Sequence, residues 1–301
     1  MKRLRNRCVA VAAGLLLDRV LGEPPTALHP VAWFGTVMGR VEHGLWADRR
    51  RPGFTYAATG LAIGVMAGAV VHSTSAAVAI AAAGRALRST AHDVGRVTES
   101  GDLDLARTEL RALVGRDPSS LDPSGISAAV IESVAENSVD AVIAPVFWAL
   151  AAGAPGALAY RAVNTMDAMV GHRNDRYRHF GTAAARLDDM ANWIPARLFA
   201  GLVAIVKPGD ISVILRTVRR DAPSHPSPNA GVAESAMAAV LGRQLGGPLR
   251  YGDRVERRPA LGNGPRPNPA DIATAVQIAN RVELLTVGLL VGTAAAFRRN
   301  L

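Results

Sequence analysis

Apolar and polar stretches alternate along the chain, and the longest apolar stretches predict membrane-spanning helices. Residues 54–84 contain no Asp, Glu, Lys or Arg, and a helix of about 20 apolar residues crosses the hydrocarbon core of a bilayer. A second uncharged run covers residues 141–160, and weaker candidates cover 198–206 and 284–297. A soluble bundle of Ala-rich helices stays an alternative for the later runs, because Ala and Gly are only weakly apolar. For residues 54–84 the pattern favours the membrane.

The N-terminal stretch imitates a secretory signal without completing one. Basic MKRLRNR precedes apolar CVAVAAGLLL, but Asp18 and Arg19 stand where small cleavage-site residues belong. We therefore expect an uncleaved, membrane-associated first helix. The excess of basic residues on cytoplasmic loops places this end and Arg49–Arg51 in the cytoplasm. The first apolar stretch is then re-entrant or interfacial, and the protein is predicted to be a multi-pass protein of the cell membrane.

Glycines recur at every fourth position inside the first apolar run, at Gly60, Gly64 and Gly68. This spacing places a smooth ridge on one face of a helix, which is typical of close packing between membrane helices. Chance in a Gly-rich chain is the alternative interpretation.

The polar segments predict helices and loops rather than strands. Residues 103–114 have the pattern of an amphipathic helix that ends at Gly115, and residues 208–271 include a Pro/Gly-rich stretch typical of loops. We find no alternation typical of strands, no repeat and no linker. The predicted fold class is therefore all-α: a polytopic integral-membrane helical protein of one domain, residues 1–301, whose polar loops form the active site.

Composition removes several classes of function. The net charge is +9, but the Arg residues are scattered through polar loops and aromatic residues make up only 5%, so no nucleic-acid partner is expected. Cys8 is the only cysteine, which excludes an intrachain disulfide and a thiolate metal cluster. GxxxxGK[ST], HExxH, GxSxG and GxGxxG are all absent from the sequence, so any ATP site lies outside the common motifs.

Three carboxylates share one face of a predicted helix. Glu132, Glu136 and Asp140 are spaced four residues apart, Asn137 lies beside them, and the second uncharged run follows directly. Like charges at this spacing repel one another, whereas Mg²⁺ prefers such oxygen ligands together with substrate phosphates. A solvated acidic face is the alternative, and it suits Glu132 better than Asp140.

A second group follows the uncharged run. Arg161, Asn164 and Asp167 fall on roughly one helix face, and Gly171 opens a stretch of hydrogen-bond donors. A glycine followed by clustered donors is a plausible cradle for an anion, although a solvated basic loop would have the same pattern. The donors include His172, Arg173, Asn174 and Arg176.

Two further groups complete the candidate chemistry. Asp188 and Asp189 are adjacent carboxylates of the kind that hold metal ions in phosphoryl-transfer sites, and Arg186 and Asn192 flank them. The fourth group lies in HPSPNAGVAESA, where Asn229 and Glu234 follow His225, although a capped turn would have the same pattern.

These residues lie in strings that resemble the adenosylcobinamide-phosphate synthase family. The strings are LLLDRVLGEPP, ESVAENSVDAVIAPVFWAL, GAPGALAYRAVNTMDAMVGHRNDRYRHFG, AARLDDMANWIPARL and HPSPNAG. The resemblance runs from about Leu15 to Tyr251. It departs from the family pattern in GEPP, where GDPP is expected, and in Val232–Ala233, where Trp–Pro is expected.

The resemblance implies an enzyme that uses ATP and Mg²⁺ to join adenosylcobyric acid to (R)-1-amino-2-propanol or its phosphate. The implied partners are the corrinoid, the amine, ATP and the lipid bilayer, and a homo-oligomer is left open. A non-catalytic corrinoid-binding protein or transporter is the alternative. We assign catalysis to Glu136, Asp140, Asp167 and His172, the metal to Glu132, Glu136, Asp188 and Asp189, and substrate or phosphate binding to Arg161, Asn164, Arg173, Asn174, Arg176, Arg186, Asn137, Asn192, His225 and Asn229.

Overall fold

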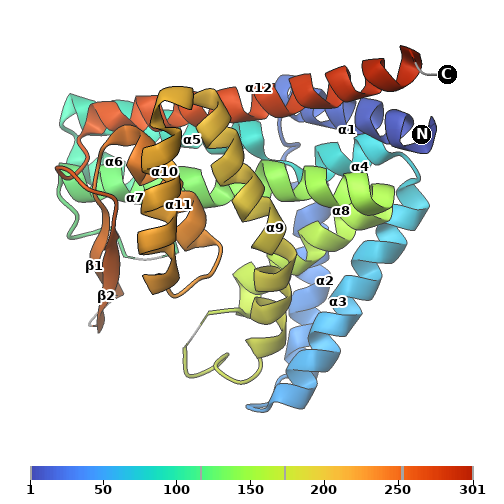
Figure 1. The fold of residues 1–301 in the computed structure, drawn as a ribbon. Coiled ribbons are helices and arrows are strands. Elements are labelled where there is room, and N and C mark those ends of the chain that lie inside the picture. Colours follow the sequence, from blue (N-terminus) through green and yellow to red (C-terminus); the bar gives the residue numbers. More distant parts are fainter. Residues whose placement is uncertain (1, 116, 173, 252–253, 300–301) are drawn as a thin grey trace. The chain divides into compact units, whose positions relative to one another are not determined.

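Helices dominate the fold (Figure 1), as the sequence predicts. The computed structural model describes residues 2–115, 117–172, 174–251 and 254–299, with no account of the side chains of residues 248–257 and 299. Within the described residues, four helical segments are long and apolar enough to cross a membrane. The prediction of an all-α, polytopic membrane protein is therefore confirmed. The four segments are Arg50–Val71, Pro123–Val170, Thr182–Val206 and Pro269–Arg298.

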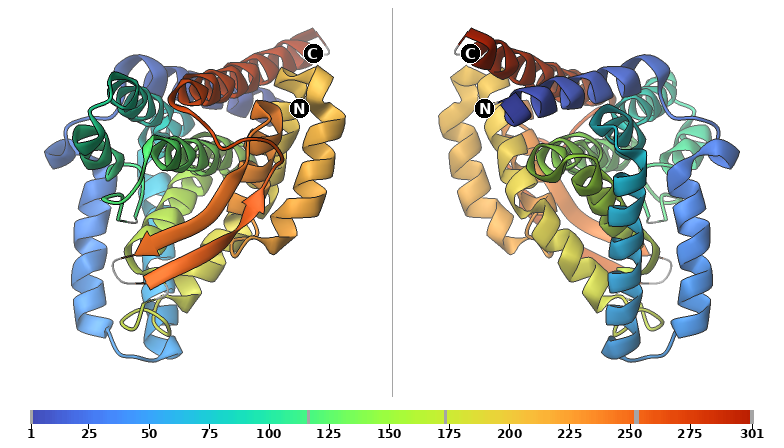
Figure 2. Two further views of the ribbon diagram at one scale, coloured as in Figure 1. Left: turned by 90° about the vertical axis from the view of Figure 1, so that its left-hand side faces the viewer. Right: turned by 90° about the vertical axis from the view of Figure 1, so that its right-hand side faces the viewer.

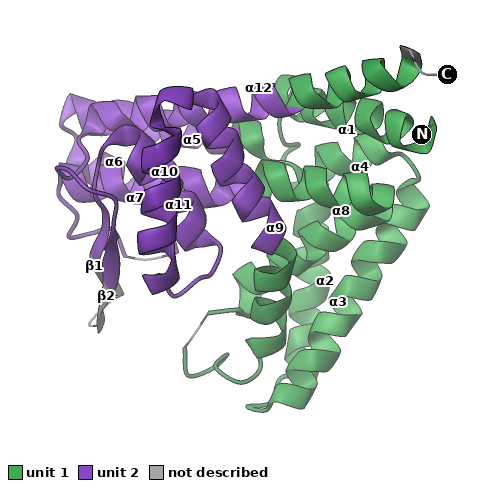
Figure 3. Cartoon of the chain, in the orientation of Figure 1, with its two compact units in different colours: residues 1–85, 140–192, 287–301 green, residues 86–139, 193–286 purple. Residues whose placement is uncertain are grey.

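The chain folds as two compact units, each assembled from segments far apart in sequence (Figure 3). Unit 1 comprises residues 1–85, 140–192 and 287–301, and unit 2 comprises residues 86–139 and 193–286. The four boundaries between the units, at residues 85/86, 139/140, 192/193 and 286/287, all fall inside helical segments. That the chain forms one domain stays a prediction.

Unit 1 is built from N-terminal helices and from the central helices that carry the second and third candidate groups. The uncharged run 54–84 divides into two helices, because the chain leaves the helical conformation at His72, whose φ is 54°. The elements are α1 (Lys2–Leu21), η1 (Thr26–Leu28), α2 (Pro30–Leu45), α3 (Arg50–Val71), α4 (Thr74–Ala81), the π-helical turn η2 (Val139–Ile143), α8 (Ala144–Val170), the first part of α9 (Thr182–Val206) and the end of α12 (Pro269–Arg299).

The predicted glycine ridge of α3 lies against α8. Gly60, Gly64 and Gly68 are all buried, and a methyl group on Gly64 would lie 2.7 Å from the Cβ atom of Ala162. Gly60 faces Met166 in the same way, while Gly68 faces the backbone of Ala154 and Pro155 in α8. The spacing in the sequence therefore marks a real helix–helix contact.

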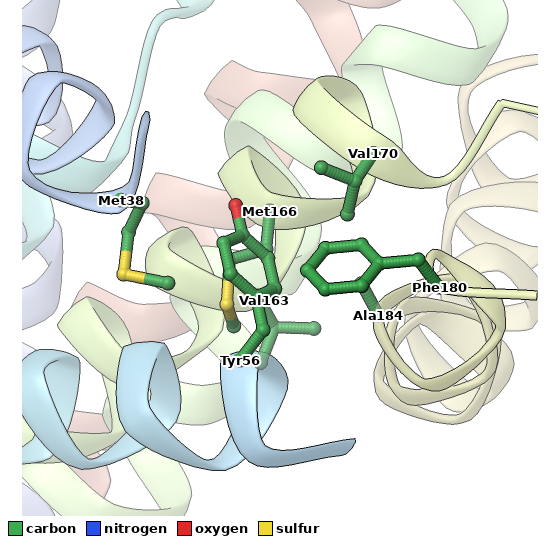
Figure 4. Packing of buried hydrophobic residues seen from close by; sticks show 7 residues of the cluster. All are labelled: Met38, Tyr56, Val163, Met166, Val170, Phe180 and Ala184. Atoms are coloured by element: carbon green, nitrogen blue, oxygen red, sulfur yellow. The ribbon is translucent and has the colours of Figure 1, made fainter. Parts of the chain in front are cut away.

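An apolar cluster packs near the start of α3 and the end of α8 (Figure 4). The rings of Tyr56 on α3 and Phe180, just before α9, lie 5.3 Å apart at an angle of 51°, an arrangement that aromatic pairs favour. Met38, Met166 and Val170 surround them and are fully buried. The cluster thus joins α2, α3 and α8 to the start of α9.

α8 is kinked near its middle, and the N-terminal helix covers the break. Gly153 has a positive φ of 68° and Pro155 follows inside the helix, which removes backbone hydrogen bonds that a regular helix would make. Arg7 of α1 donates from Nη1 to the backbone oxygens of Leu150 and Ala151, at 3.1 and 2.8 Å. This guanidinium therefore satisfies carbonyl groups that the kink leaves open.

Unit 2 contains the remaining helices and a β-hairpin (Figure 2). The predicted amphipathic helix is α6, whose Ala106 and Leu110 are buried, but it ends at Leu110 rather than at Val114 as predicted. The elements are α5 (Gly84–Ser100), α6 (Leu103–Leu110), α7 (Pro123–Ser138), η3 (Pro208–Asp210), α10 (Ile211–Asp221), η4 (Ala222–Ser224), α11 (Ala230–Leu241), β1 (Leu245–Tyr251), β2 (Arg254–Leu261), the second part of α9 and most of α12.

The hairpin corrects one prediction, because the sequence of residues 245–261 predicts loop. β1 and β2 pair antiparallel, with Leu245 opposite Leu261 and an irregularity between Leu245 and Gly247. Gly246 has a positive φ of 76° there, which suits a bulge. Its N–H donates to the buried carboxylate of Glu132 at 2.9 Å. A contact with α7 therefore supports a strand whose own sequence is typical of a turn.

Candidate functional site

A network of buried and partly buried polar side chains in unit 1 joins three of the four predicted groups. Tyr160 on α8 lies at its centre, and its hydroxyl donates to Oδ1 of Asn192 at 2.9 Å. The same hydroxyl lies 3.3 Å from Oδ1 of Asp140. Tyr160 and Asn192 are each only 2% exposed. Burial makes these bonds consequential, because a buried polar group that loses its partner costs about 1–3 kcal/mol.

Asp188 forms the other side of the network. Its two carboxylate oxygens accept hydrogen bonds from Nδ2 of Asn164, at 3.3 Å, and from Nδ2 of Asn192, at 3.0 Å. Arg161 lies beside Asn164, with 3.5 Å between its Nη1 and the amide oxygen. We call Asp140, Tyr160, Asn164, Asp188 and Asn192 the polar network.

Helical spacing explains why these side chains meet. Tyr160 and Asn164 are four residues apart on α8, and Asp188 and Asn192 are four residues apart on α9, so each pair lies on one helix face. Asp140 sits in the π-helical turn η2. Such turns inside a long helix are frequent at functional sites, since they shift the face on which a side chain lies.

The donor atoms of the polar network are suited to a hard cation. The carboxylates of Asp140 and Asp188 and the amide oxygens of Asn164 and Asn192 supply oxygen atoms only, which Mg²⁺ prefers. Among the described residues, no three His, Cys, Asp or Glu side chains are grouped as a metal site. Mg²⁺ is commonly bound through one or two carboxylates together with substrate phosphates, and Asp140 and Asp188 are the carboxylates present here.

Among the described residues, the basic stretch after Gly171 makes hydrogen bonds with α2 and not with the polar network. Arg176 donates from Nη2 to Oε1 of Glu42 on α2 at 2.9 Å, and its guanidinium lies 4.9 Å from the ring of Trp46. Tyr177 donates its hydroxyl to the same Glu42 oxygen at 2.8 Å, and its backbone N–H donates to Asn174. These contacts attach the stretch to the end of α2.

The hydrogen bonds to Glu42 also change how the attached groups titrate. The pKa of Arg176 is raised, first by its hydrogen bond to Glu42 and then by that to Tyr177. Burial and the hydrogen bond to Glu42 raise the pKa of Tyr177. Arg176 therefore remains a cation and is already engaged by a carboxylate.

The other predicted residues of unit 1 are placed as follows. His172 and Arg186 are exposed, whereas Asp167 and Asp189 are partly buried. Arg173 lies outside the described residues.

The three predicted residues of α7 belong to unit 2, and two of them make contacts that hold the fold. Glu132 is 5% exposed and accepts the hydrogen bond from Gly246 of the hairpin. Asn137 donates to the backbone oxygen and the hydroxyl of Ser133. Glu136 is exposed. The helix therefore divides its polar side chains between internal support and the surface.

The fourth predicted group forms a second buried cluster, within unit 2. Nε2 of His225 lies 3.7 Å from the carboxylate of Glu234, with both side chains almost fully buried. Nδ1 of His225 accepts from the backbone N–H of Ser227 at 3.1 Å. Asn229 lies 3.4 Å from Arg197. These contacts fix the turn HPSPNAG against the start of α11.

Sequence patterns missed one member of these clusters, Tyr160. It ends an uncharged run and has the pattern of an apolar residue. Its position, four residues before Asn164 on the same helix, is the signal that could have identified it. Glu234 was named with His225 and Asn229 from the sequence, and it is the one ionisable side chain of an otherwise uncharged helix.

The fold and the polar network define a helical, polytopic membrane protein with a buried polar site on its long apolar helices. Residues 11–279 match the family model described as CobD/Cbib protein. The chain belongs to this family.

The relatives match the chain over nearly its whole length. "Cobalamin biosynthesis protein CobD" of Mycobacterium tuberculosis is 42% identical, over 93% of this chain and 93% of its own. The protein of the same name from Chromobacterium violaceum is 41% identical over 96% and 97%. That from Rhodobacter capsulatus is 40% identical over 96% and 98%. No solved structure matches the chain.

Proposed function

We propose that this protein acts in cobalamin biosynthesis as an adenosylcobinamide-phosphate synthase, an ATP-dependent ligase of the membrane. Its relatives carry the name of cobalamin biosynthesis proteins. The observation that carries the proposal is the polar network of Asp140, Tyr160, Asn164, Asp188 and Asn192, whose two carboxylates are partly buried on apolar helical segments. Ionisable groups within membrane helices are costly to bury, so they point to a functional site.

The proposed reaction has two steps. A carboxylate oxygen of adenosylcobyric acid attacks the γ-phosphorus of ATP, and the bond to the β-phosphate oxygen breaks, which gives an acyl phosphate and ADP. The amine of 1-amino-2-propanol, or of its phosphate, then attacks the acyl carbon. An amide forms, phosphate leaves and one proton is lost from nitrogen. Activation is needed because a carboxylate is a poor electrophile.

The polar network supplies the groups that this chemistry needs. Asp188 is held between two amide donors, so its carboxylate has a fixed orientation, and we assign it with Asn164 and Asn192 to a Mg²⁺–ATP complex. Bound Mg²⁺ would neutralise charge on the phosphates. Asp140 is the carboxylate we assign to accept the proton of the amine, and Tyr160 orients it through the hydroxyl contact.

The test is product formation by the full chain, purified in detergent, from adenosylcobyric acid, ATP, Mg²⁺ and aminopropanol or its phosphate. Asp188→Asn keeps the volume and removes the charge, and we expect a loss of kcat of roughly thirty- to a thousand-fold, equivalent to about 2–4 kcal/mol. Asp140→Asn should show a comparable loss.

Asp93→Asn serves as a matched control, since Asp93 lies half-exposed on α5, and its activity should equal wild type. A folded wild-type protein that forms no amide would refute the proposed reaction and favour a binding protein or transporter. Normal turnover by both network variants would remove the network from catalysis.

A further inference from the structure

Unit 1 contains a partly open apolar cavity of about 290 Å³ that the proposed reaction does not use, although Arg161 in its wall was predicted from the sequence to bind substrate or phosphate. It is lined by α2, α3, α4 and the second half of α8. Hydrocarbon side chains form nearly all of its wall, among them Val31, Phe34, Val37, Ile63, Ala67 and Leu158.

Arg161 is the one charged residue among those that line the cavity. Its Nε atom is buried and has no hydrogen-bond partner among the described residues. Its Nη1 atom makes only the long 3.5 Å contact with Asn164. A buried, unsatisfied N–H of a guanidinium is costly, because it has lost water without gaining an acceptor. An anionic group in the cavity would supply that acceptor.

The other polar groups of the wall are already engaged. The indole N–H of Trp33 donates to the backbone oxygen of Ala27 at 2.9 Å, and the hydroxyl of Thr165 donates to the backbone oxygen of Arg161 at 2.8 Å. A nucleotide base, a sugar or an amide-bearing corrinoid would therefore leave its own polar groups unpaired in the cavity. The wall suits a hydrocarbon chain that ends in one acid group.

We propose that the cavity binds an anionic amphiphile of the bilayer, with its acyl chain in the apolar space and its acid group on Arg161. α3 and α8 both belong to segments long and apolar enough to cross a membrane, so the surrounding lipid presents such chains to this part of the protein. The shared chemistry is an acyl chain with one anionic oxygen group, as in a free fatty acid or an acidic phospholipid. This inference does not depend on the proposed reaction.

A fluorescence titration of the detergent-purified full chain with dansyl-undecanoate measures this binding directly. We expect saturable binding that oleate displaces and oleyl alcohol, which has the chain but not the charge, displaces at least about ten-fold less well. Phosphatidylglycerol is the second competitor. Displacement by oleate alone identifies a fatty acid, and displacement by both identifies the wider class of acidic lipids.

Two kinds of variant test separately how the charge of Arg161 and the apolar space contribute to binding. Arg161→Gln should weaken binding by about ten-fold or more, whereas Arg40→Gln, the same change at a position of α2 outside the wall, should not. Ala67→Trp fills the space and should abolish binding, with Met66→Trp, one residue away and outside the wall, as its control. If Ala67→Trp fails to fold, Val37→Trp takes its place.

Two results would overturn the proposal. One is equal competition by oleate and its alcohol. The other is wild-type affinity in folded Arg161→Gln or in a folded, space-filling variant.

Discussion

The buried hydroxyl of Tyr160 contacts polar side chains from two other parts of the chain. Asn192 on α9 accepts the bond at 2.9 Å, and Asp140 before α8 lies within 3.3 Å. Without the hydroxyl, the amide oxygen of Asn192 would lose this buried donor. The consequence is a joint effect on stability and on the position of the carboxylate.

We therefore predict that Tyr160→Phe lowers both kcat and the free energy of unfolding, the latter by about 1–3 kcal/mol. Product formation and thermal unfolding in detergent measure the two effects. Tyr56→Phe is the control, because Tyr56 is equally buried but its hydroxyl contacts a weak acceptor, the sulfur of Met169, at 3.9 Å. Equal effects of the two substitutions would show that the network does not depend on this hydroxyl.

Asp221 offers a pH-dependent test outside the membrane segments. Arg220 donates to both of its carboxylate oxygens, at 2.6 and 2.7 Å, and this pairing holds the pKa of Asp221 below its usual range, with help from the N–H of Gly262. A lowered pKa means that the charged form stabilises the fold. That contribution is complete above the unfolded pKa of about 3.9 and is lost as the pH falls through the lower, folded value.

Asp221→Asn should accordingly lower Tm at neutral pH, and its difference from wild type should shrink as the pH is brought below about 4. Thermal unfolding across a pH series measures this. A difference that stays constant with pH would mean that the carboxylate's charge contributes nothing.

Helical spacing in the sequence singled out four residues that the structure brings together, and it gave no sign of contacts that depend on distant parts of the chain. Asp140, Asn164, Asp188 and Asn192 were all predicted as site residues, because helical periodicity alone shows which polar groups share a face. Glu132 was predicted beside Glu136 on the same grounds. Its contact with Gly246 depends on a hairpin more than a hundred residues later, which no local pattern reveals.

At the scale of elements, the contact between α3 and α8 depends on the absence of side chains. Gly64 lies so close to α8 that a methyl group would meet Ala162 at 2.7 Å. Interiors are close-packed, so added volume must push the helices apart. Gly288 on α12 is a contrasting position, with nothing among the described residues within 4 Å of such a methyl group.

Gly64→Leu should therefore destabilise the protein by about 1–3 kcal/mol or more, while Gly288→Leu should be tolerated. Thermal unfolding of the two variants in detergent measures this difference in stability. Comparable loss in both variants would attribute the effect to glycine in a membrane helix in general rather than to this contact.

The stretch after Gly171 has two possible roles for Arg176, anchoring the stretch to α2 and binding a phosphate, and two variants separate them. Glu42 accepts hydrogen bonds from both Arg176 and Tyr177, so Glu42→Gln should speed hydrogen exchange of residues 174–181 with little change in global stability, as expected for a half-exposed ion pair. Glu99→Gln, at an exposed position on α5, should change neither.

Arg176→Lys tests the predicted phosphate contact at the same place. If Arg176 binds a phosphate, this variant alone should raise KM for ATP or for aminopropanol phosphate, because an ammonium lacks the planar fork. If the guanidinium only anchors the stretch, Arg176→Lys and Glu42→Gln should have similar effects on exchange and none on KM.

The sequence predicted the helices and missed the hairpin for one physical reason. Helix periodicity and uncharged length are local properties, and they identified the apolar runs that lie in α3, α8, α9 and α12. Residues 245–251 form a strand that pairs with β2 and contacts the carboxylate of Glu132 on α7, whereas GGPLRYG by itself has the pattern of a turn.

For the whole molecule, the apolar segments predict behaviour in the cell. We expect the protein to sediment with membranes, to remain there after salt and alkaline washing, and to require detergent for extraction, because four segments are long enough to span a bilayer. Fractionation followed by immunoblotting measures this. Recovery of active monomer from a salt-washed soluble fraction would contradict it.

The interleaving of the two units sets the order in which the protein can be completed during translation. Unit 1 begins with the first 85 residues but also includes residues 140–192 and the last stretch of α12. At about 5–20 residues per second, roughly 10–40 s separate the synthesis of its first and last segments. During the first part of that interval α8 has not yet been synthesised, so the glycine face of α3 has no helix to pack against. We expect lipid to cover this face until its partner leaves the ribosome.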